Sequence, residues 1–304
     1  MAKIVVIGSL NMDIVAVAAR LPLAGETISG IQYINEPGGK GANQAYAASK
    51  LGGDVAMLGR VGTDDHGKQI RANLEAVGCD VGGLQAIEGN SGVAVIFVAQ
   101  SGQNSIVVVP GANQRYRPSD LQADAHSLAG AHVVLLQLET PMETVIAAAH
   151  AAKRLGARVI LDPAPAPELL SLELLRHVDI LTPNETEAAQ LAGAPVTTLS
   201  LDQARDIGRQ LQRFGPKTVI MKLGAQGCLL MERDVVTPIP APVVEAVDTT
   251  AAGDVFNGAL AVAYSEGASL LEACRFAGRA AALSVTRLGA QRSMPSRSEV
   301  MGAL

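Results

Sequence analysis

The fold is decided by the stretch Val247-Asp248-Thr249-Thr250-Ala251-Ala252-Gly253-Asp254-Val255-Phe256-Asn257-Gly258, which an alanine-rich segment of helical composition follows to about residue 266. Small residues at 251–253 leave backbone N–H groups accessible at a helix N-terminus, where the helix dipole also favours negative charge. The segment therefore predicts an anion seat at Ala251, Ala252 and Gly253, with Asp254 beside it. A dipole at a surface contributes only about 0.3–1 kcal/mol, so a phosphoryl group in transfer also needs a metal ion.

Asp254 and Asp248 each have a chemical and a structural interpretation. Asp254 can accept the proton of an attacking hydroxyl group, and loss of a general base costs about 10²–10⁴ in rate. Aspartate is also a common capping residue, so either side chain could merely cap the helix that begins here. The two interpretations are compatible if Asp248 caps the helix or binds an ion while Asp254 acts as the base.

Outward from this stretch, strand and helix signals alternate along the chain. Short apolar runs typical of strands buried on both faces lie at residues 3–7, 55–58, 133–138, 158–161, 178–181 and 218–222. Helical spacing separates most of them, for example at 143–155, 185–191 and 201–214. This alternation predicts an α/β fold of Rossmann type, with a mostly parallel central sheet flanked by helices.

Two insertions interrupt that alternation. Residues 14–17 with 27–34, and 92–99 with 104–109, are typical of antiparallel strands, the second pair turning through residues 100–103. A small antiparallel sheet cannot bury both of its faces alone, so it should cover a cleft, a partner subunit or both. We therefore predict one domain over residues 1–304, with a β lid inserted at about 14–35 and 92–110 that also forms a homodimer.

Two glycine-containing clusters in the N-terminal half are suited to binding hydroxyl groups. In Gly38-Gly39-Lys40-Gly41-Ala42-Asn43-Gln44-Ala45 the chain can approach a ligand closely, and Lys40 and Asn43 offer polar groups. In Gly8-Ser9-Leu10-Asn11-Met12-Asp13, the residues Asn11 and Asp13 face the same side of extended backbone and could grip vicinal hydroxyls. The structural alternatives are an ordinary turn before a helix and turn-forming residues at a strand end.

Polar residues also follow several of the predicted strands. In open α/β sheets, ligands bind outside the carboxyl ends of the strands, so these residues should gather at one edge. They are Glu139, Asp162, Asn184, Glu187 and Lys222, the last followed by Leu223-Gly224-Ala225-Gln226-Gly227.

Several functional classes are disfavoured by composition and motif. The formal charge of −5 provides no basic field for nucleic acid, and no apolar stretch approaches the eighteen or so residues that span a bilayer. The strand after Met1 lacks the G-x-G-x-x-G loop of a nicotinamide oxidoreductase, and no serine lies in G-x-S-x-G. The three cysteines are far apart in sequence, and no signal peptide is evident, so we expect a cytoplasmic protein.

Together these segments resemble the ribokinase-like carbohydrate kinases from residue 4 to about residue 295. Gly38–Asn43 (GGKGAN) is similar to the first signature of that family, and Asp248–Gly258 (DTTAAGDVFNG) to the second. The resemblance implies in-line transfer of a phosphoryl group from ATP to a sugar hydroxyl, with Mg²⁺ and an activating monovalent cation, usually K⁺.

The resemblance also implies roles for individual residues. Asp254 corresponds to the base, and the N–H groups of Ala252 and Gly253 correspond to the anion hole. The implied sugar contacts are Asn11, Asp13, Gly39, Lys40, Asn43 and Glu139. Asn184 and Glu187 form the N-x-x-E element near the phosphates and Mg²⁺, while Lys222, Gly224 and Gly227 belong to the nucleotide loop, although some members have threonine at 222. The implied ligands of the monovalent cation are Asp248, Thr250, Ser284, Arg287, Gly289 and Ser293.

The acceptor is expected to be D-ribose, phosphorylated at its 5-hydroxyl. Deoxyribose, a keto-deoxy sugar acid or a nucleoside remain alternatives, although four Phe, four Tyr and no Trp offer few platforms for a nucleobase. A sugar-binding regulator without catalysis is an alternative of another class, which an intact Asp254 disfavours. Gly38-Gly39 is the candidate hinge of the lid.

Overall fold

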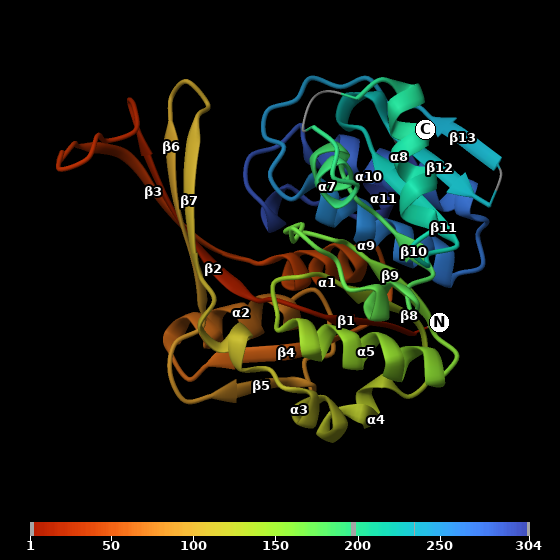
Figure 1. Ribbon diagram of the computed structural model, residues 1–304. Coiled ribbons are helices and arrows are strands. Elements are labelled where there is room, and N and C mark those ends of the chain that lie inside the picture. Colours follow the sequence, from red (N-terminus) through yellow and green to blue (C-terminus); the bar gives the residue numbers. More distant parts are fainter. Residues whose placement is uncertain (1–2, 196–198, 234, 303–304) are drawn as a thin grey trace.

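The computed structural model describes residues 3–195, 199–233 and 235–302, whose strands form one large and one small sheet (Figure 1). The large sheet is nine-stranded and parallel from β11 to β5, with antiparallel pairing of β12 and β13 at one edge. In sheet order its strands are β13 (Val235–Ile239), β12 (Cys228–Glu232), β11 (Thr218–Lys222), β10 (Ile180–Leu181), β9 (Arg158–Leu161), β8 (Ala131–Leu136), β1 (Lys3–Ile7), β4 (Asp54–Gly62) and β5 (Leu84–Ile87).

The large sheet carries a hydrophobic core on each face, because side chains alternate across a strand. In β1, Ile4 and Val6 belong to one core, whereas Val5 and Ile7 belong to the other. The first core is covered by α1 (Lys40–Lys50), α2 (Asp65–Glu75), α9 (Ala252–Ser265), α10 (Leu270–Ser284) and α11 (Arg297–Gly302). The second is covered by α3 (Pro118–Ala123), α4 (Ala125–Leu128), α5 (Met142–Arg154), α6 (Leu172–Leu175), α7 (Glu185–Leu191) and α8 (Leu201–Gln212).

The small sheet extends away from this body (Figure 1). It consists of β3 (Gly30–Gly38), β2 (Asn11–Ala18), β6 (Gly92–Ala99) and β7 (Asn104–Val109), in that order. The β2–β3 and β6–β7 pairs are antiparallel as expected, and parallel pairing of β2 with β6 joins them. The sheet meets the body where β2 begins, four residues after β1 ends, and where β3 ends, two residues before α1 begins.

The predicted fold class is confirmed, and the element bounds differ in detail. The strand expected at 178–181 is reduced to two residues, and the one expected at 133–138 ends at Leu136, so that Gln137 and Glu139 lie beyond it. The expected strand at 27–34 begins only at Gly30. Strands β5, β12 and β13 were not among the predicted ones. No helix in the described ranges combines the length and apolar character needed to cross a bilayer.

Candidate active site

The residues predicted to do chemistry meet at the carboxyl ends of the parallel strands. Asp254 lies in the first turn of α9 and is buried, with 6% of its surface exposed. Its carboxylate oxygens accept hydrogen bonds from two amides of α1, from Asn43 Nδ2 at 3.0 Å and from Gln44 Nε2 at 3.1 Å. The two signature segments, more than 200 residues apart in sequence, therefore contact each other directly.

Asp254 does not cap its helix. The N-cap of α9 is Ala251, which has a left-handed backbone with φ 59° and makes no side-chain capping bond. The N–H of Ala252 donates to Thr249 O at 3.2 Å. For Gly253 and Asp254, the described part of the chain contains no acceptor of the backbone N–H. The free donors of the predicted anion seat thus begin at Gly253, which is one of the expected residues, and extend to Asp254.

Burial dominates the electrostatics of Asp254. It raises the pKa of this carboxyl to about 6; the charge of Lys40 and the bonds from Asn43 and Gln44 oppose that rise, while the charge of Asp162 adds to it. Burial also lowers the pKa of Lys40, but the surrounding carboxylates, Asp254 first among them, outweigh burial and hold the pKa above its usual range. Asp254 is therefore ionised at neutral pH and still basic enough to accept a proton.

The expected sugar-binding residues line the junction between the small sheet and the body. The amide oxygen of Asn11 accepts a hydrogen bond from Asn113 Nδ2 at 2.8 Å, so the orientation of the Asn11 side chain is fixed. Asp13 lies against Gly38, where an added Cβ would come within 2.1 Å of Asp13 Oδ2. Burial, followed by the charges of Glu36, Glu139 and Asp254, raises the pKa of Asp13 to about 7.

Glu139 and the residues around Gly39 complete this junction. Glu139 Oε2 accepts hydrogen bonds from Ser9 Oγ and from the Lys40 N–H, the latter at 3.3 Å. Gly39 has φ 88°, and an added Cβ would lie 2.7 Å from the backbone nitrogen of Asn11. A glycine is required here both for the left-handed backbone and for the close approach of two chain segments.

The N-x-x-E element forms a helix capping box in this structure. Asn184 Oδ1 accepts from Glu187 N at 2.8 Å, and the two oxygens of Glu187 accept from Asn184 N at 2.8 Å and from Asn184 Nδ2 at 2.9 Å. Burial raises the pKa of Glu187, against the charge of Lys222. With both oxygens already occupied, Glu187 is suited to contact Mg²⁺ through water rather than to enclose it. Mg²⁺ commonly retains several waters, so the arrangement fits this ion.

Lys222 connects the expected nucleotide loop with the predicted anion seat. Its Nζ lies 3.0 Å from Asp162 Oδ1, and an added Cβ on Gly253 would lie 3.3 Å from the same Nζ. After Lys222 the chain turns through Gly224 and Gly227, both with positive φ, and Leu223 N donates to Gly227 O at 2.8 Å. The ammonium group is thus placed beside the N-terminus of α9, where it can neutralise a phosphate.

The segments expected to hold a monovalent cation are tied together by hydrogen bonds. Asp248 accepts from Thr250 N, Thr250 Oγ1 and Gly289 N at 2.9, 2.6 and 2.8 Å. Burial raises its pKa, but these three bonds outweigh burial, and the net shift is downward. Ser284 and Ser293 donate their hydroxyl protons to carbonyls, which leaves the oxygens available. Arg287 instead pairs with Glu299 at 2.6 Å, so only its backbone could act as a ligand.

The site contains carboxylates without a preformed metal cluster. Throughout the described ranges, no three His, Cys, Asp or Glu side chains come together in a way that could hold a metal ion.

The comparison with known protein families agrees with this geometry. The model of the pfkB family carbohydrate kinases matches residues 1–297. The chain belongs to this family.

Relatives of this pfkB kinase span nearly its whole length. A ribokinase of Bacillus subtilis is 42% identical, covering 99% of this chain and 98% of its own. A deoxyribokinase of Salmonella typhi is 39% identical, over 96% of this chain and 95% of its own. The structure of Arabidopsis thaliana ribokinase complexed with ribose and ATP has a TM-score of 0.92 and 39% identity, covering 99% of this chain and 98% of that one.

Sequence reasoning missed the polar residues that support the site of this pfkB kinase. Asn113 fixes Asn11, Gln291 donates to Asn43 Oδ1 at 3.0 Å, and Gln44 and Gln137 lie behind Asp254. Gln44 lies within the first signature, and Gln137 directly follows β8, so both had a local signal. Asn113 and Gln291 lie in short 3₁₀ turns with no pattern that distinguishes them.

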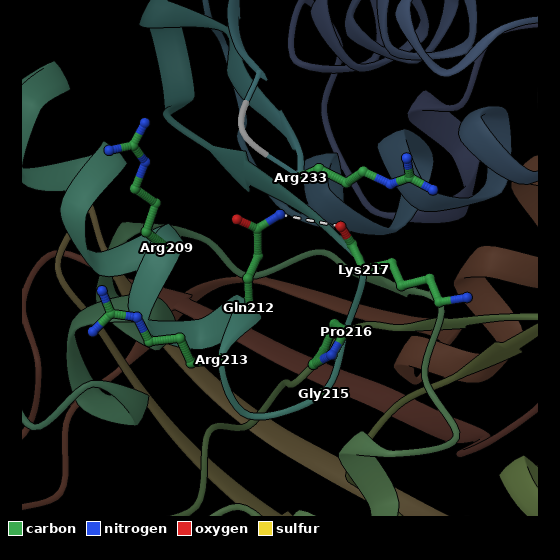
Figure 2. Close-up of a pocket in the computed structure, with 7 residues that line it drawn as sticks. All are labelled: Arg209, Gln212, Arg213, Gly215, Pro216, Lys217 and Arg233. Carbon is green, nitrogen blue, oxygen red and sulfur yellow. Dashed lines mark hydrogen bonds between the residues drawn. The ribbon is translucent and has the colours of Figure 1, made fainter.

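A hollow on the surface of this pfkB kinase lies away from the site. It measures about 530 Å³ and is lined by Arg209, Gln212, Arg213, Gly215, Pro216, Lys217 and Arg233. Lys217 immediately precedes β11, whereas Lys222 ends that strand, so hollow and site are at opposite ends of it. In Figure 2, Arg209 and Arg213 extend to one side of Gln212, and Lys217 and Arg233 to the other. These cations do not converge on a common point, and none was predicted as a site residue.

Proposed function

We propose that this carbohydrate kinase transfers the γ-phosphoryl group of ATP to the 5-hydroxyl of D-ribose, giving ribose 5-phosphate and ADP. The observation that carries the proposal is the placement of Asp254: a buried carboxylate, held by two amide donors, lies next to backbone N–H groups of Gly253 and Asp254 that have no acceptor among the described residues. A base and an anion seat side by side are what transfer to a hydroxyl group requires.

In the proposed reaction Asp254 removes the proton of the 5-hydroxyl as its oxygen attacks the γ-phosphorus. The new O–P bond forms while the bond from the γ-phosphorus to the bridging oxygen breaks, and ADP leaves with that electron pair. The Gly253 N–H and the Lys222 ammonium stabilise the charge on the transferring group. Mg²⁺, when bound with the nucleotide, would supply further neutralisation of the phosphates, and Glu187 would hold it through water.

Recognition of the sugar follows from the polar groups at the junction. The carboxylate of Asp13 accepts hydrogen bonds from sugar hydroxyls, and Asn11, Lys40, Asn43 and Glu139 surround the same space as further polar partners. Gly39 lets the first signature pack against the backbone of Asn11, which holds these groups together. A site that hydrogen-bonds a hydroxyl can reject an analogue without it by up to about 10⁴–10⁵. If Asp13 binds the 2-hydroxyl, deoxyribose is a poor substrate.

Deoxyribose is nevertheless the second candidate acceptor. The Salmonella deoxyribokinase is nearly as similar to this chain as the ribokinases are, at 39% against 42% identity. Overall identity therefore does not separate the two acceptors, and only the side chains that face the 2-hydroxyl can do so.

We further propose a K⁺ site at the segment tied by Asp248, with ligands among Asp248, Thr250, Ser284, Arg287, Gly289 and Ser293. The ionised Asp248 provides charge, and the hydrogen-bonded backbone provides carbonyl groups at fixed positions.

The three buried free thiols, at Cys79, Cys228 and Cys274, suit a reducing compartment such as the cytoplasm.

We also propose a homodimer through the small sheet. Large apolar side chains on that sheet are unusually exposed, and contiguous exposed apolar surface commonly marks an interface. They are Ile31, Tyr33, Phe97, Ile106, Val107, Val108 and Val109. Sedimentation at micromolar protein should give a dimer, and Val107→Asp should convert it to a monomer; a monomeric wild type would contradict the proposal.

The central test measures ADP release from Mg-ATP with ribose, deoxyribose, hexoses, a keto-deoxy sugar acid and nucleosides, with and without K⁺. Ribose should lead the panel, K⁺ should raise the rate, and Asp254→Asn should lower kcat by about 10²–10⁴. Because asparagine keeps the shape of aspartate, the variant should still bind ribose. Equal turnover by Asp254→Asn would refute the base assignment, and a lead by deoxyribose would replace the acceptor.

A further inference from the structure

Gln44 is a fully buried side chain that touches both carboxylates at the centre of the site. It lies in the first turns of α1, and none of its surface is exposed. Its Nε2 donates to Asp254 Oδ1 at 3.1 Å and to Asp162 Oδ2 at 3.0 Å. Its Oε1 accepts from Gln137 Nε2 at 2.7 Å. The amide therefore uses both of its donors and its acceptor within one network.

The two carboxylates fix the orientation of the Gln44 amide. Because an ionised carboxylate can only accept, Asp254 and Asp162 require the nitrogen of Gln44 to face them, and its oxygen then faces Gln137 Nε2. Two ionised carboxylates at this proximity repel each other, and a shared neutral donor between them relieves part of that repulsion without adding charge. Gln44 thus separates Asp254 from Asp162 while it binds both.

The same network reaches the opposite side of the reaction. Asp162, held by Gln44, accepts from Lys222 Nζ at 3.0 Å, and Lys222 Nζ lies beside Gly253 at the N-terminus of α9. The acceptor side of the proposed transfer contains Asp254, and the donor side contains Lys222. A single amide therefore connects the group that removes the proton with the group that neutralises the phosphate.

We propose that Gln44 is a positioning residue which sets the distance and orientation of Asp254 relative to the Asp162–Lys222 ion pair. The proposal rests on the function proposed above, in which Asp254 is the base. Gln44 itself touches neither sugar nor nucleotide in this account. Its effect is to hold the base aligned, and a misplacement of about 1 Å in such a site can cost about 10²-fold in rate.

Loss of the Gln44 donor should also change the titration of Asp254. The charges of Lys40 and Asp162 act directly on this carboxyl, and Asp254 in turn affects Asp13. Glu139 and Glu187 act on Lys40, and Lys222 pairs with Asp162, so these three lie one neighbour further away. The bonds from Asn43 and Gln44 lower the Asp254 pKa, whereas burial and Asp162 raise it. Removal of Gln44 therefore shifts this pKa upward. The step of the rate profile that belongs to Asp254, called the acid limb below, then moves to higher pH, while the step that belongs to Asp13 stays in place.

The decisive experiment compares Gln44→Met with wild type by pH profiles of kcat and kcat/KM for ribose. Methionine fills a similar volume without a donor. We expect kcat at pH 8 to fall about 10–100-fold with the KM for ribose little changed. We expect the acid limb to move up by about one pH unit, the scale of a hydrogen bond to a charged group. A lower kcat with an unmoved limb would overturn the proposal, because a merely structural role produces that result.

Gln212→Met is the matched control. Gln212 also donates two hydrogen bonds, to Lys217 O and Met231 O at 3.1 Å each, but at the distal hollow (Figure 2). It should lose some stability and keep the wild-type profile. If Gln212→Met moves the limb as far as Gln44→Met does, the inference fails.

Gln44→Glu keeps the test decisive if Gln44→Met does not fold. The glutamate keeps the shape of the side chain and places a third carboxyl beside Asp254 and Asp162, so the limb should move further upward. A profile equal to wild type would overturn the inference. Asp254→Asn, assayed in parallel, distinguishes failure of the proposed function from failure of this inference. If Asp254→Asn is active, Asp254 is not the base. If Asp254→Asn is inactive and the acid limb is unmoved in both Gln44 variants, only the role of Gln44 is refuted.

Discussion

The two sheets of this molecule differ in what holds them together. In the large sheet both faces are covered, and every residue of β8 from Val133 to Leu136 has at most 1% of its surface exposed. In the small sheet β7 is exposed along its whole length, with Val107 at 60%. Hydrophobic burial therefore stabilises the large sheet, whereas the small sheet depends on backbone pairing and on its attachment to the body.

The difference divides the proposed chemistry between a rigid and an adjustable part. Asp254, Asp162 and Lys222 are fixed to helix and strand ends of the large body. Asn11 and Asp13 begin β2, at the root of the small sheet, where they are paired with Gly38 and Glu36 of β3. Groups that need a fixed geometry lie in the packed part, and groups that close around a sugar lie where the packing ends.

The largest expected effect is the difference in stability between the two sheets. Leu135→Ala in β8 should lower the free energy of unfolding by about 2–5 kcal/mol, because it leaves a cavity in a packed core. Val107→Ala in β7 should change the free energy of unfolding of the monomer by less than about 0.5 kcal/mol. Urea unfolding measures both. If Val107→Ala loses more stability than this, the loss should depend on protein concentration, as a subunit contact would require. A large loss that is independent of concentration would contradict the claim that burial stabilises only the large sheet.

A comparison of Gly39→Ala with Gly102→Ala tests whether the junction is more tightly packed than the turn at the tip of the small sheet. Gly39 and Gly102 have nearly the same left-handed φ, 88° and 86°, but an added Cβ at Gly102 meets nothing within 4 Å. Gly102→Ala should cost about 1–2 kcal/mol for the backbone alone. Gly39→Ala should cost about 1–3 kcal/mol more from steric overlap, together with lost turnover.

This pair also limits the hinge hypothesis for Gly38-Gly39. An added Cβ at either glycine overlaps neighbouring atoms, so impaired turnover in an alanine variant reports packing as well as motion. Equal stability losses at Gly39 and Gly102 would remove the steric argument, and unchanged kinetics in Gly39→Ala would remove the hinge.

The pH dependence of kcat/KM should distinguish Asp13, at the root of the small sheet, from Asp254, in the body. Burial raises the pKa of Asp13 to about 7 and that of Asp254 to about 6. Both act as carboxylates, so kcat/KM should fall tenfold per pH unit below pH 7 and more steeply below pH 6. Asp13→Asn should remove the upper step and leave the lower one. A single step near pH 6 in the wild type would refute the role of Asp13.

The smallest effect is expected at an ion pair, called the tether here, that joins Glu36 of the small sheet to Arg292 near the C-terminus. Glu36 Oε2 lies 2.6 Å from Arg292 Nε, on a pair that is partly exposed. Arg292→Ala should cost less than about 1 kcal/mol, as should the control Arg297→Ala, which breaks an exposed pair with Glu266. Only Arg292→Ala should accelerate limited proteolysis of the segment between β2 and β3. Equal proteolysis of both variants would show that the pair is no tether.

The sequence predicted the packed part of the molecule best. Buried strands such as β1 and β9 appear as continuous apolar runs, and their bounds agree with the prediction. The pattern failed where tertiary pairing decides the structure. β12 has the same apolar character as a parallel strand, but a short turn after β11 returns it antiparallel. β10 ends at Leu181 as predicted but begins only at Ile180, because α6 and the turn that follows it extend to residue 177.

The site was predictable as a set of residues but not as a network. The signature residues Asn43 and Asp254 were expected to act together, and they lie in hydrogen-bonding contact. The Asp162–Lys222 pair and the amides of Gln44 and Gln137 depend on positions that meet only after the sheet has formed, so spacing could not reveal them. The N-x-x-E pattern of Asn184 and Glu187 fits both an element near the phosphates and a helix capping box, so the pattern alone could not distinguish them.

The crowding of acids around the sugar site has a consequence for product departure. Asp13, Glu36, Glu139 and Asp254 lie near one another, and Asp13 is affected by the charges of the other three. A neutral pentose enters this acidic environment without penalty. A pentose phosphate leaves with about two negative charges, which these carboxylates repel. The same carboxylates that we propose as acceptors for the sugar hydroxyls therefore disfavour retention of a phosphorylated sugar, and they oppose binding of one as a substrate.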